Sequence, residues 1–420
     1  MALGSIDIRP AWESAWIREL AADDPAAEEI VSAYLSGLST AGYLIDEQGV
    51  WVAAGPYPMA QNQGDTLRPA ASLTKIATTL AALVTWEPES HFETLVGWRG
   101  EIKDGVLTGD LVIEGGNDPL FVSEEAIALG NALEKLNIRR VTGDLIIAGD
   151  SFTMNFETSP SKSGQILKQV LNSAEWDYAI SSSYQNFPPN TPKPSIQIDG
   201  QVKISAASWK DQVSGWLIRH QSLPLVAVLK AMNIYSNNPM AEQVANMVGG
   251  SAAVMSKAIE IGVMPAELSL VNGSGLGEAN QMSPRAAVLM LQKIQALLQP
   301  QGYTLADIFP VTGADGGTVA DRNLPANTVV KTGTLAVVSA LAGAVPTAER
   351  GIVWFSLLNY GAGLDNLRSR QDQIILAIEQ QWGKATETPP ELRTTVNIGQ
   401  APYLFGDPGR NQPITLPPSP

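Results

Sequence analysis

The chain has 420 residues, 45% of them hydrophobic, which is enough to bury a large core and to form two domains or one large domain with an insertion. Its 27 basic and 42 acidic side chains give a formal net charge of -15, so its average field repels polyanions and argues against nucleic acid as a partner. The chain has no cysteine and two histidines, His91 and His220, which excludes disulfides and thiolate chemistry and leaves little room for a Ser-His-Asp triad or a multi-histidine metal site.

The first residues show no secretory signal peptide, because charged residues interrupt them and no apolar core follows before Asp23. The longest apolar stretch, residues 335–345, is well short of the roughly 20 residues that cross a bilayer. We therefore expect no transmembrane segment.

The N-terminal part predicts two helices with strands between them. The first helix begins at Pro25, with Asp24 as its cap. Strand-like runs follow at 43–45 and 50–53, and the apolar run 70–84 then suits a buried helix.

Between about residues 99 and 222 the pattern changes to short strands and turns. Residues 108–113 are echoed by 142–147, with a helix predicted over 124–135 between the two copies. Two copies are too few for a repeat protein, so we interpret them as paired strands of one inserted lobe. Residues 181–194, rich in Ser, Asn and Pro, are predicted to form a loop.

The C-terminal half predicts helices first and strands later. Helical periodicity marks four segments, 225–232, 241–248, 252–261 and 284–298, and β-branched runs mark three strands, 329–334, 336–344 and 352–358. After about residue 386, Pro, Gly and Asn predict a mobile tail. The predicted organisation is a main domain in two segments with an accessory domain inserted between them, followed by the tail: 1–98, 99–222, 223–385 and 386–420.

The candidate nucleophile is Ser72, at the predicted start of the helix 70–84. Lys75 lies three residues later on the same helical face, and a lysine whose pKa is lowered by burial or by another cation can take the serine proton. A Ser-x-x-Lys match is weak evidence alone, because Ser159 and Lys162 repeat it in a Ser/Pro-rich loop.

Two further motifs follow in order, Ser236-Asn237-Asn238 and Lys331-Thr332-Gly333-Thr334. Together with Ser-x-x-Lys they form the signature of penicillin-binding proteins and class A β-lactamases. Lys331 would place a second cation near Lys75 and favour its neutral form, while Ser236 would relay a proton to the leaving amine. Asn238 would donate to a substrate amide oxygen and accept from Lys75.

The third motif is predicted to bind substrate along a strand edge. Gly333 would let a peptide lie close to the strand, and Thr332 and Thr334 project to one face, where they would bind a terminal carboxylate. The backbone N–H groups of Ser72 and Thr334 are the natural oxyanion donors.

At these residues the chain resembles the D-alanyl-D-alanine carboxypeptidase/endopeptidase family, the class C low-molecular-mass penicillin-binding proteins or peptidase family S13. The resemblance extends over roughly residues 41–359 and includes further segments at 68–75, 109–119, 272–276, 283–285 and 312–318.

This resemblance implies an α+β multidomain fold: a β-lactamase/transpeptidase-like domain, with an antiparallel sheet flanked by helices, and an inserted smaller α/β lobe. It implies a serine-type D-Ala-D-Ala carboxypeptidase, with endopeptidase activity as a further expectation. The expected partners are peptidoglycan stem peptides ending in D-Ala-D-Ala and β-lactam inhibitors, acting through an acyl-enzyme at Ser72. No metal or cofactor is implied, and the location is the periplasm or cell envelope.

Two alternatives remain at this stage. Tyr235-Ser236-Asn237 also fits the Tyr-x-Asn motif of class C β-lactamases, which would make the protein a β-lactamase or an esterase on the same scaffold. The other alternative is a non-catalytic protein that binds the cell wall, against which the presence of Lys75 and Lys331 argues.

Overall fold

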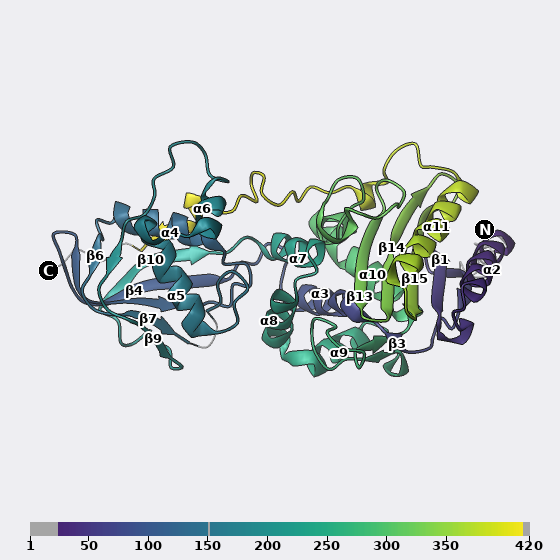
Figure 1. Cartoon of the computed structure of the whole chain (residues 1–420), viewed down its shortest axis with the longest axis horizontal. Helices are drawn as coiled ribbons and strands as arrows, with labels where there is room; N and C mark the ends of the chain where they lie inside the picture. The colour runs from purple at the N-terminus through teal and green to yellow at the C-terminus, as the bar shows by residue number, and fades with distance from the viewer. Residues whose placement is uncertain (1–23, 150–151, 415–420) are drawn as a thin grey trace, which may run out of the picture. The chain divides into compact units, whose positions relative to one another are not determined.

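The computed structural model describes residues 24–149 and 152–414 and divides them into two compact units (Figure 1). The first unit comprises residues 24–85, 232–238 and 248–395, and the second 86–231, 239–247 and 396–414. The N-terminal segment, for which the sequence predicts no signal peptide, lies outside the described residues. Within the described ranges, no helix is long and apolar enough to span a bilayer.

The first unit is built on a five-stranded antiparallel sheet in the order β13-β14-β15-β1-β2. Its strands are β1 (Gly49–Ala54), β2 (Tyr57–Asn62), β13 (Val329–Leu335), β14 (Val338–Thr347) and β15 (Gly351–Tyr360). The three late strands are confirmed. The strand expected at 43–45 is wrong: a 3-10 turn, Ile45–Glu47, occupies its end, and β1 forms its hairpin with β2.

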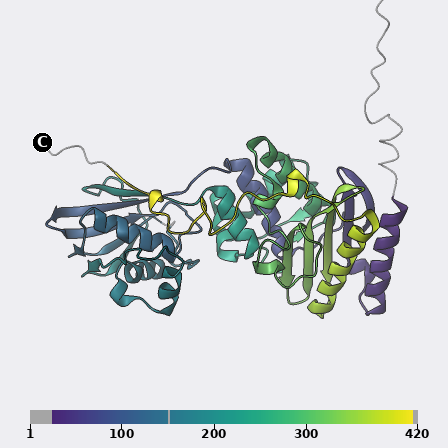
Figure 2. The ribbon, with the colours of Figure 1, turned by 90° about the horizontal axis from the view of Figure 1, so that it is seen from above.

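Helices cover both faces of this sheet. Side chains alternate along β15, so Phe355 packs toward α2 (Pro25–Thr40) and α11 (Leu364–Trp382), while Leu358 lies toward α10 (Pro284–Leu298) on the other face. Figure 2 shows α2 and α11 side by side against the strands. The side chain of Asp24 caps α2 as predicted, whereas α11 was not predicted from the sequence.

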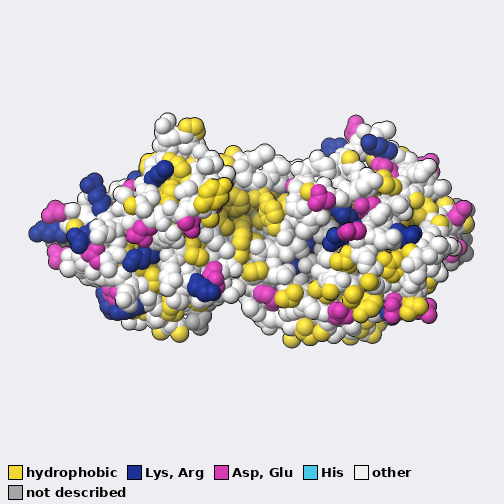
Figure 3. Space-filling model, in the orientation of Figure 1, with side chains coloured by type: hydrophobic (Ala, Val, Ile, Leu, Met, Phe, Trp, Pro, Cys, Tyr) yellow, Lys and Arg dark blue, Asp and Glu magenta, His cyan; other side chains and the backbone are white. Residues whose placement is uncertain are grey.

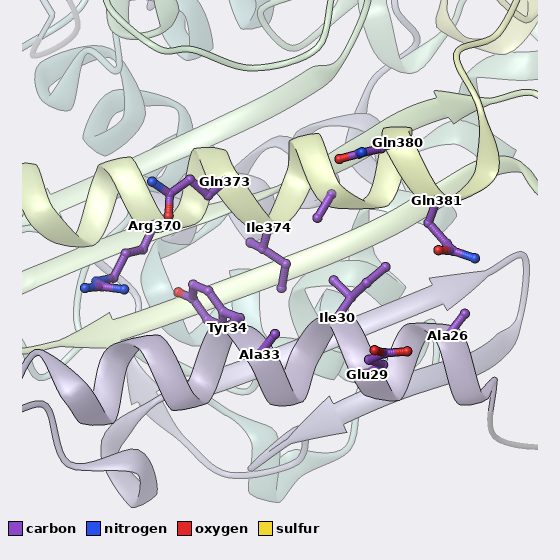
Figure 4. A pocket seen from close by; sticks show the side chains of 11 residues that line it. Ala26, Glu29, Ile30, Ala33, Tyr34, Arg370, Gln373, Ile374, Gln380 and Gln381 are labelled. Atoms are coloured by element: carbon purple, nitrogen blue, oxygen red, sulfur yellow. The ribbon is translucent and has the colours of Figure 1, made fainter.

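The seam between α2 and α11 is a hollow of about 600 Å³ (Figure 4). Below it, a buried polar network fixes both helices to the sheet. The Tyr34 hydroxyl donates to Asn359 Oδ1 at 2.9 Å, and Gln371 Nε2 donates to the same oxygen at 2.8 Å. Because burying such groups is favourable only when they are paired, this network sets the position of α11 against the sheet.

Four more helices agree with the predicted segments. Helices α3 (Thr74–Thr85) and α9 (Gly250–Glu260) belong to the first unit, whereas most of α7 (Leu225–Ile234) and of α8 (Asn238–Val248) belongs to the second. A small three-stranded sheet joins β3 (Arg68–Pro69), β12 (Gln281–Met282) and β11 (Leu268–Ser269). Short 3-10 turns complete the unit at Ala71–Leu73, Pro265–Glu267, Gln299–Gln301, Leu305–Asp307, Gly317–Val319 and Pro390–Leu392.

The second unit is built on a mixed sheet. Its antiparallel part runs β16 (Asn411–Pro413), β10 (Gly215–Gln221), β4 (Glu93–Lys103) and β5 (Val106–Glu114), and its parallel part adds β6 (Arg140–Val141), β7 (Leu145–Ala148), β8 (Gln197–Ile198) and β9 (Val202–Ser205). The two copies of the sequence echo do pair: Leu111 of β5 lies opposite Leu145 of β7 in parallel register.

Helices α4 (Ser123–Lys135), α5 (Pro160–Val170) and α6 (Tyr178–Tyr184) belong to the second unit, with 3-10 turns at Ser173–Glu175 and Pro408–Arg410. Helix α4 agrees with the prediction, whereas the second half of α6 occupies the first residues of the stretch 181–194, which was expected to be a loop.

On the face shown in Figure 3, acidic side chains are scattered among neutral and basic ones. The net negative charge is therefore not gathered into one patch on that face.

The observed boundaries differ from the predicted ones in two places. Strand β4 runs continuously across the predicted break at residues 98 and 99, because its register with β5 extends from Leu95 to Lys103. Residues 396–414 also do not form a free tail: β16 adds to the edge of β10, and the Asn411 side chain contacts His220 at 2.9 Å. The last residues of the predicted tail, 415–420, lie outside the described ranges.

Candidate active site

Ser72 lies in the 3-10 turn Ala71–Leu73, immediately before α3. The backbone of Ala71 has φ of 46°, a left-handed conformation that an alanine adopts only under constraint. This turn leaves the Ser72 side chain half-buried at the N-terminal end of α3, where the helix dipole favours developing negative charge.

Lys75 lies in the first turn of α3 and is fully buried. Its Nζ is 3.0 Å from Ser72 Oγ, 2.7 Å from Asn238 Oδ1 and 2.7 Å from the Ser274 carbonyl oxygen. The amide and carbonyl oxygens only accept hydrogen bonds, whereas a serine hydroxyl both donates and accepts. These two acceptors can hold the two N–H bonds of a neutral amine, and its lone pair then faces Ser72.

Ser236 and Lys331 form a second contact in the same site. The Lys331 Nζ donates to Ser236 Oγ at 2.9 Å and to the Thr332 carbonyl at 2.8 Å. Ser236 has φ of 50°, the second left-handed residue of the site. Burial, and then the charge that Lys75 carries when it is protonated, hold the pKa of Lys331 well below its ordinary value.

Strand β13 presents an open edge beside the nucleophile. The Val330 N–H donates to the Pro310 carbonyl, away from β14, so the N–H groups of Thr332 and Thr334, two and four residues on, point to the same open side. Gly333 lies close to the nucleophile: a Cβ there would stand 3.1 Å from Ser72 N and 2.9 Å from the Ala70 carbonyl.

The structure thus brings together Ser72, Lys75, Ser236, Asn238 and residues 331–334, all within the first unit. It also separates the two possible registers of the second motif. Asn238 and Ser236 contact the lysines, while the Tyr235 side chain is 63% exposed. Ser159 and Lys162, which repeat the Ser-x-x-Lys spacing, lie at the start of α5 in the second unit and not in the expected loop. Ser159 precedes the helix, and Lys162 pairs with Glu157 at 3.6 Å.

Sequence reasoning missed the part played by the loop 272–280. Its Ser274 carbonyl accepts from Lys75, and Gly273 accepts from Thr78 Oγ1 at 2.7 Å. A Cβ on Gly275 would lie 1.8 Å from the Ala71 carbonyl, so glycine is required for this loop to pack against the nucleophile turn. The Gly-Ser-Gly pattern is the signal, although a carbonyl ligand itself leaves no trace in the side-chain sequence.

The residues that the structure describes contain no group of three or more His, Cys, Asp and Glu side chains suited to a metal ion. The histidines lie in the second unit. His91 Nδ1 is 2.8 Å from the Ser222 carbonyl, and His220 is buried.

Comparisons with known proteins identify the family to which this chain belongs. Residues 45–163 and 185–381 match the model of the D-Ala-D-Ala carboxypeptidase 3 (S13) family. The D-alanyl-D-alanine carboxypeptidase DacB of Haemophilus influenzae is 24% identical over 410 residues, covering 74% of this chain and 84% of that protein. A D-alanyl-D-alanine carboxypeptidase of Actinomadura is 32% identical over 209 residues, covering 45% of this chain and 38% of that one.

Solved structures share the fold at low sequence identity. A predatory endopeptidase of Bdellovibrio bacteriovorus has a TM-score of 0.67 at 20% identity, over 82% of this chain and 96% of its own. Penicillin-binding protein 4 of H. influenzae has a TM-score of 0.63 at 20% identity, over 84% and 99%. The multidomain, transpeptidase-like fold expected from the sequence is therefore confirmed, and the chain belongs to the D-Ala-D-Ala carboxypeptidase 3 (S13) family of serine peptidases.

Proposed function

We propose that this enzyme removes the terminal D-Ala from peptidoglycan stem peptides through an acyl-enzyme at Ser72. One observation carries the proposal: the 3.0 Å contact between Ser72 Oγ and the buried Lys75 amine, whose other neighbours Asn238 and Ser274 are acceptors. This geometry supplies a base for the serine proton without a histidine.

In the acylation step, Ser72 Oγ attacks the carbonyl carbon of the penultimate D-Ala while its proton passes to Lys75 Nζ. The oxyanion would accept from the N–H groups of Ser72 and Thr334, and one such donor contributes about 3 kcal/mol in comparable sites. The C–N bond then breaks, which leaves an ester on Ser72.

The leaving amine needs a proton, and Ser236 is the proposed donor. Its hydroxyl is 2.9 Å from Lys331 Nζ, so Lys331 can restore the proton that Ser236 gives up. The proton that Lys75 took from Ser72 then replaces the one that Lys331 loses, which leaves Lys75 neutral again. D-Ala departs as a neutral amine, and water then hydrolyses the ester, with Lys75 again as the base.

The open edge of β13 would hold the substrate as an added strand, with Thr332 and Thr334 facing its terminal carboxylate. The same site would cleave a cross-link in which D-Ala is followed by another residue, which is the endopeptidase reaction. We place the enzyme in the cell envelope or, in bacteria that have one, in the periplasm, since peptidoglycan lies there. We also expect β-lactams to acylate Ser72.

Mass spectrometry of the intact protein after incubation with penicillin tests the nucleophile. We expect one adduct, on a peptide containing Ser72, and none in Ser72→Ala. Ser159→Ala is the matched control and should label normally. An adduct that persists in Ser72→Ala would reject the assignment.

Substrate assays separate the remaining functions. Release of D-Ala from a pentapeptide supports the carboxypeptidase, whereas its absence together with many rapid turnovers of nitrocefin would favour a β-lactamase. A protein that binds cell walls without releasing D-Ala and without labelling would be the non-catalytic alternative.

A further inference from the structure

A hollow of about 610 Å³ lies beside the outer end of β13, within the first unit. Thr332 and Thr334 line it from the strand, and Arg368 lines it from α11. Arg368 was not among the residues singled out in the sequence. Its Nη2 donates to Thr334 Oγ1 at 3.1 Å, so a cation touches a hydroxyl of the third motif directly.

The packing of α11 explains why Arg368 lies there. Gln371 and Asp372 follow it by three and four residues and therefore share its helical face. Gln371 Nε2 donates to the Ser339 carbonyl at 3.0 Å, and Asp372 pairs with Arg322 at 2.6 Å. These buried contacts hold the first turns of α11 against the sheet, which places the preceding turn at β13.

The two arginines that line the hollow differ in what they can do for a ligand. Arg322 has a side chain only 7% exposed and is held by both Asp372 and Gln371, so its role is structural. The Arg368 side chain is 38% exposed, and it also pairs at 3.5 Å with Asp365, whose side chain is fully exposed. A guanidinium offers five N–H donors in a planar fork, so Arg368 keeps donors for an incoming carboxylate.

Carboxylates also line the hollow, so only part of it is positively charged. Asp372 is neutralised by Arg322, while Asp321 and Asp365 lie exposed on the rim. The cationic point is therefore the edge at β13, where Arg368 meets Thr334. Two hydroxyls alone supply no charge, and a chain with a net charge of -15 otherwise repels an anion.

We infer that Arg368 is a specificity-determining residue that binds the terminal carboxylate of the substrate together with Thr332 and Thr334. This inference rests on the proposed function and names the group that the enzyme reads on its substrate: a free C-terminal carboxylate in the leaving amino acid. Arg368 takes no part in the bond-making steps.

The test compares two substrates that differ only at this group, an acyl-D-Ala-D-Ala peptide with a free carboxylate and the same peptide as its C-terminal amide. The wild type should prefer the free acid. Arg368→Ala should lower kcat/KM for the acid by about 10- to 100-fold, as for the loss of a charged hydrogen bond, and leave the amide nearly unchanged. Arg368→Lys, which keeps the charge without the fork, should recover part of the preference.

Arg370→Ala is the matched control. Arg370 lies on the same helix, but it faces the seam with α2 and donates to Asn366 at 2.8 Å (Figure 4). Its removal should leave both rates unchanged. If Arg368→Ala keeps the full preference for the acid, or slows both substrates equally, the inference is wrong. If the wild type cleaves neither peptide, the proposed function itself fails.

Discussion

Replacing Gly333 by alanine tests how closely β13 must approach the nucleophile. The added Cβ would lie 2.9 Å from the Ala70 carbonyl, 3.1 Å from Ser72 N and 3.2 Å from Ala340 Cβ. Ordinary contacts begin near 3.4 Å, so the strand must move by up to about half an ångström. Two of the three neighbours are backbone atoms, which cannot rotate away, so the shift falls on the distance between Ser72 and β13.

The expected functional loss follows from the oxyanion donors. The N–H of Ser72 is one proposed donor, and that of Thr334 is the other. A shift that removes one of them from hydrogen-bond distance costs about 100- to 1,000-fold in rate. We expect Gly333→Ala to slow acylation by fluorescent penicillin by about 100-fold, measured as the second-order rate constant from gel time courses. Stability should fall by only about 1 to 3 kcal/mol.

Gly37→Ala is the control on the same unit. Gly37 lies within α2, and an added Cβ would meet only the flexible guanidinium of Arg370. Alanine favours helix over glycine by about 1 kcal/mol, so this variant should be at least as stable and acylate normally. Wild-type acylation in a folded Gly333→Ala would refute the claim that close approach of β13 is needed.

Three further predictions concern buried charges. Lys331→Met should slow acylation at least about 100-fold, because Ser236 loses its donor, while the chemical denaturation midpoint should stay or rise since a desolvated cation is removed; a lower midpoint would contradict this. Arg322→Ala should cost about 3 to 5 kcal/mol by leaving Asp372 buried and unpaired, and a loss below about 1 kcal/mol in denaturant titrations would contradict this. Burial raises the pKa of Asp118 to about 7, so between about pH 4 and pH 7 the folded state keeps a proton that the unfolded state has lost. This carboxyl alone therefore makes the free energy of unfolding fall by about 1.4 kcal/mol for each pH unit in that range. Asp118→Asn should remove this slope and exceed wild-type stability at pH 8, and parallel curves in hydrogen exchange of the second unit would count against it.

The pH prediction depends on the groups around Asp118. Burial also raises the pKa of Glu125 to about 7, and it lowers the pKa of His220 to about 4. The His220 shift acts with the opposite sign, because the folded state lacks a proton that the unfolded one holds between about pH 4 and 6.5. Arg410 pairs with Glu125, and its charge offsets part of the rise that burial causes in the pKa of Asp118 and of Glu125. These groups remain in the Asp118→Asn variant, so the difference between the two curves reports Asp118 together with its effect on Glu125, whose pKa the charge of Asp118 raises.

The side chains that we propose as catalytic could be singled out from the sequence because each motif is short and carries its own chemistry. Ser72 and Lys75 are three residues apart, so helical geometry alone brings them together. The contacts of Asn238 and Lys331 join distant segments, and the expectation came from motif order rather than from distance. The Ser274 carbonyl could not be predicted, since every residue has a carbonyl and only the fold determines where it points.

The domain boundaries were harder to predict because they depend on pairing between distant strands. The sequence pattern changes near residue 98, which suggests a boundary there, and only the register of β4 with β5 shows that one strand runs across it. Strand β16 has three residues, Asn411–Pro413, and no hydrophobic alternation of its own. Its position is set by pairing with β10 and by the buried contact of Asn411 with His220. Neither contact can be predicted from the local sequence, which is rich in Pro and Gly.

The costly features of the first unit converge on the proposed catalytic residues. Two lysines are fully buried within one site, and Ala71 and Ser236 both adopt left-handed backbone conformations. Each is unfavourable for folding, by about 1 to 3 kcal/mol for a strained residue and by several for a desolvated cation. The sheet and its covering helices stabilise the unit enough to hold them. A site selected only for stability would keep none of these features, whereas a serine nucleophile activated by lysine requires a desolvated lysine and a fixed turn.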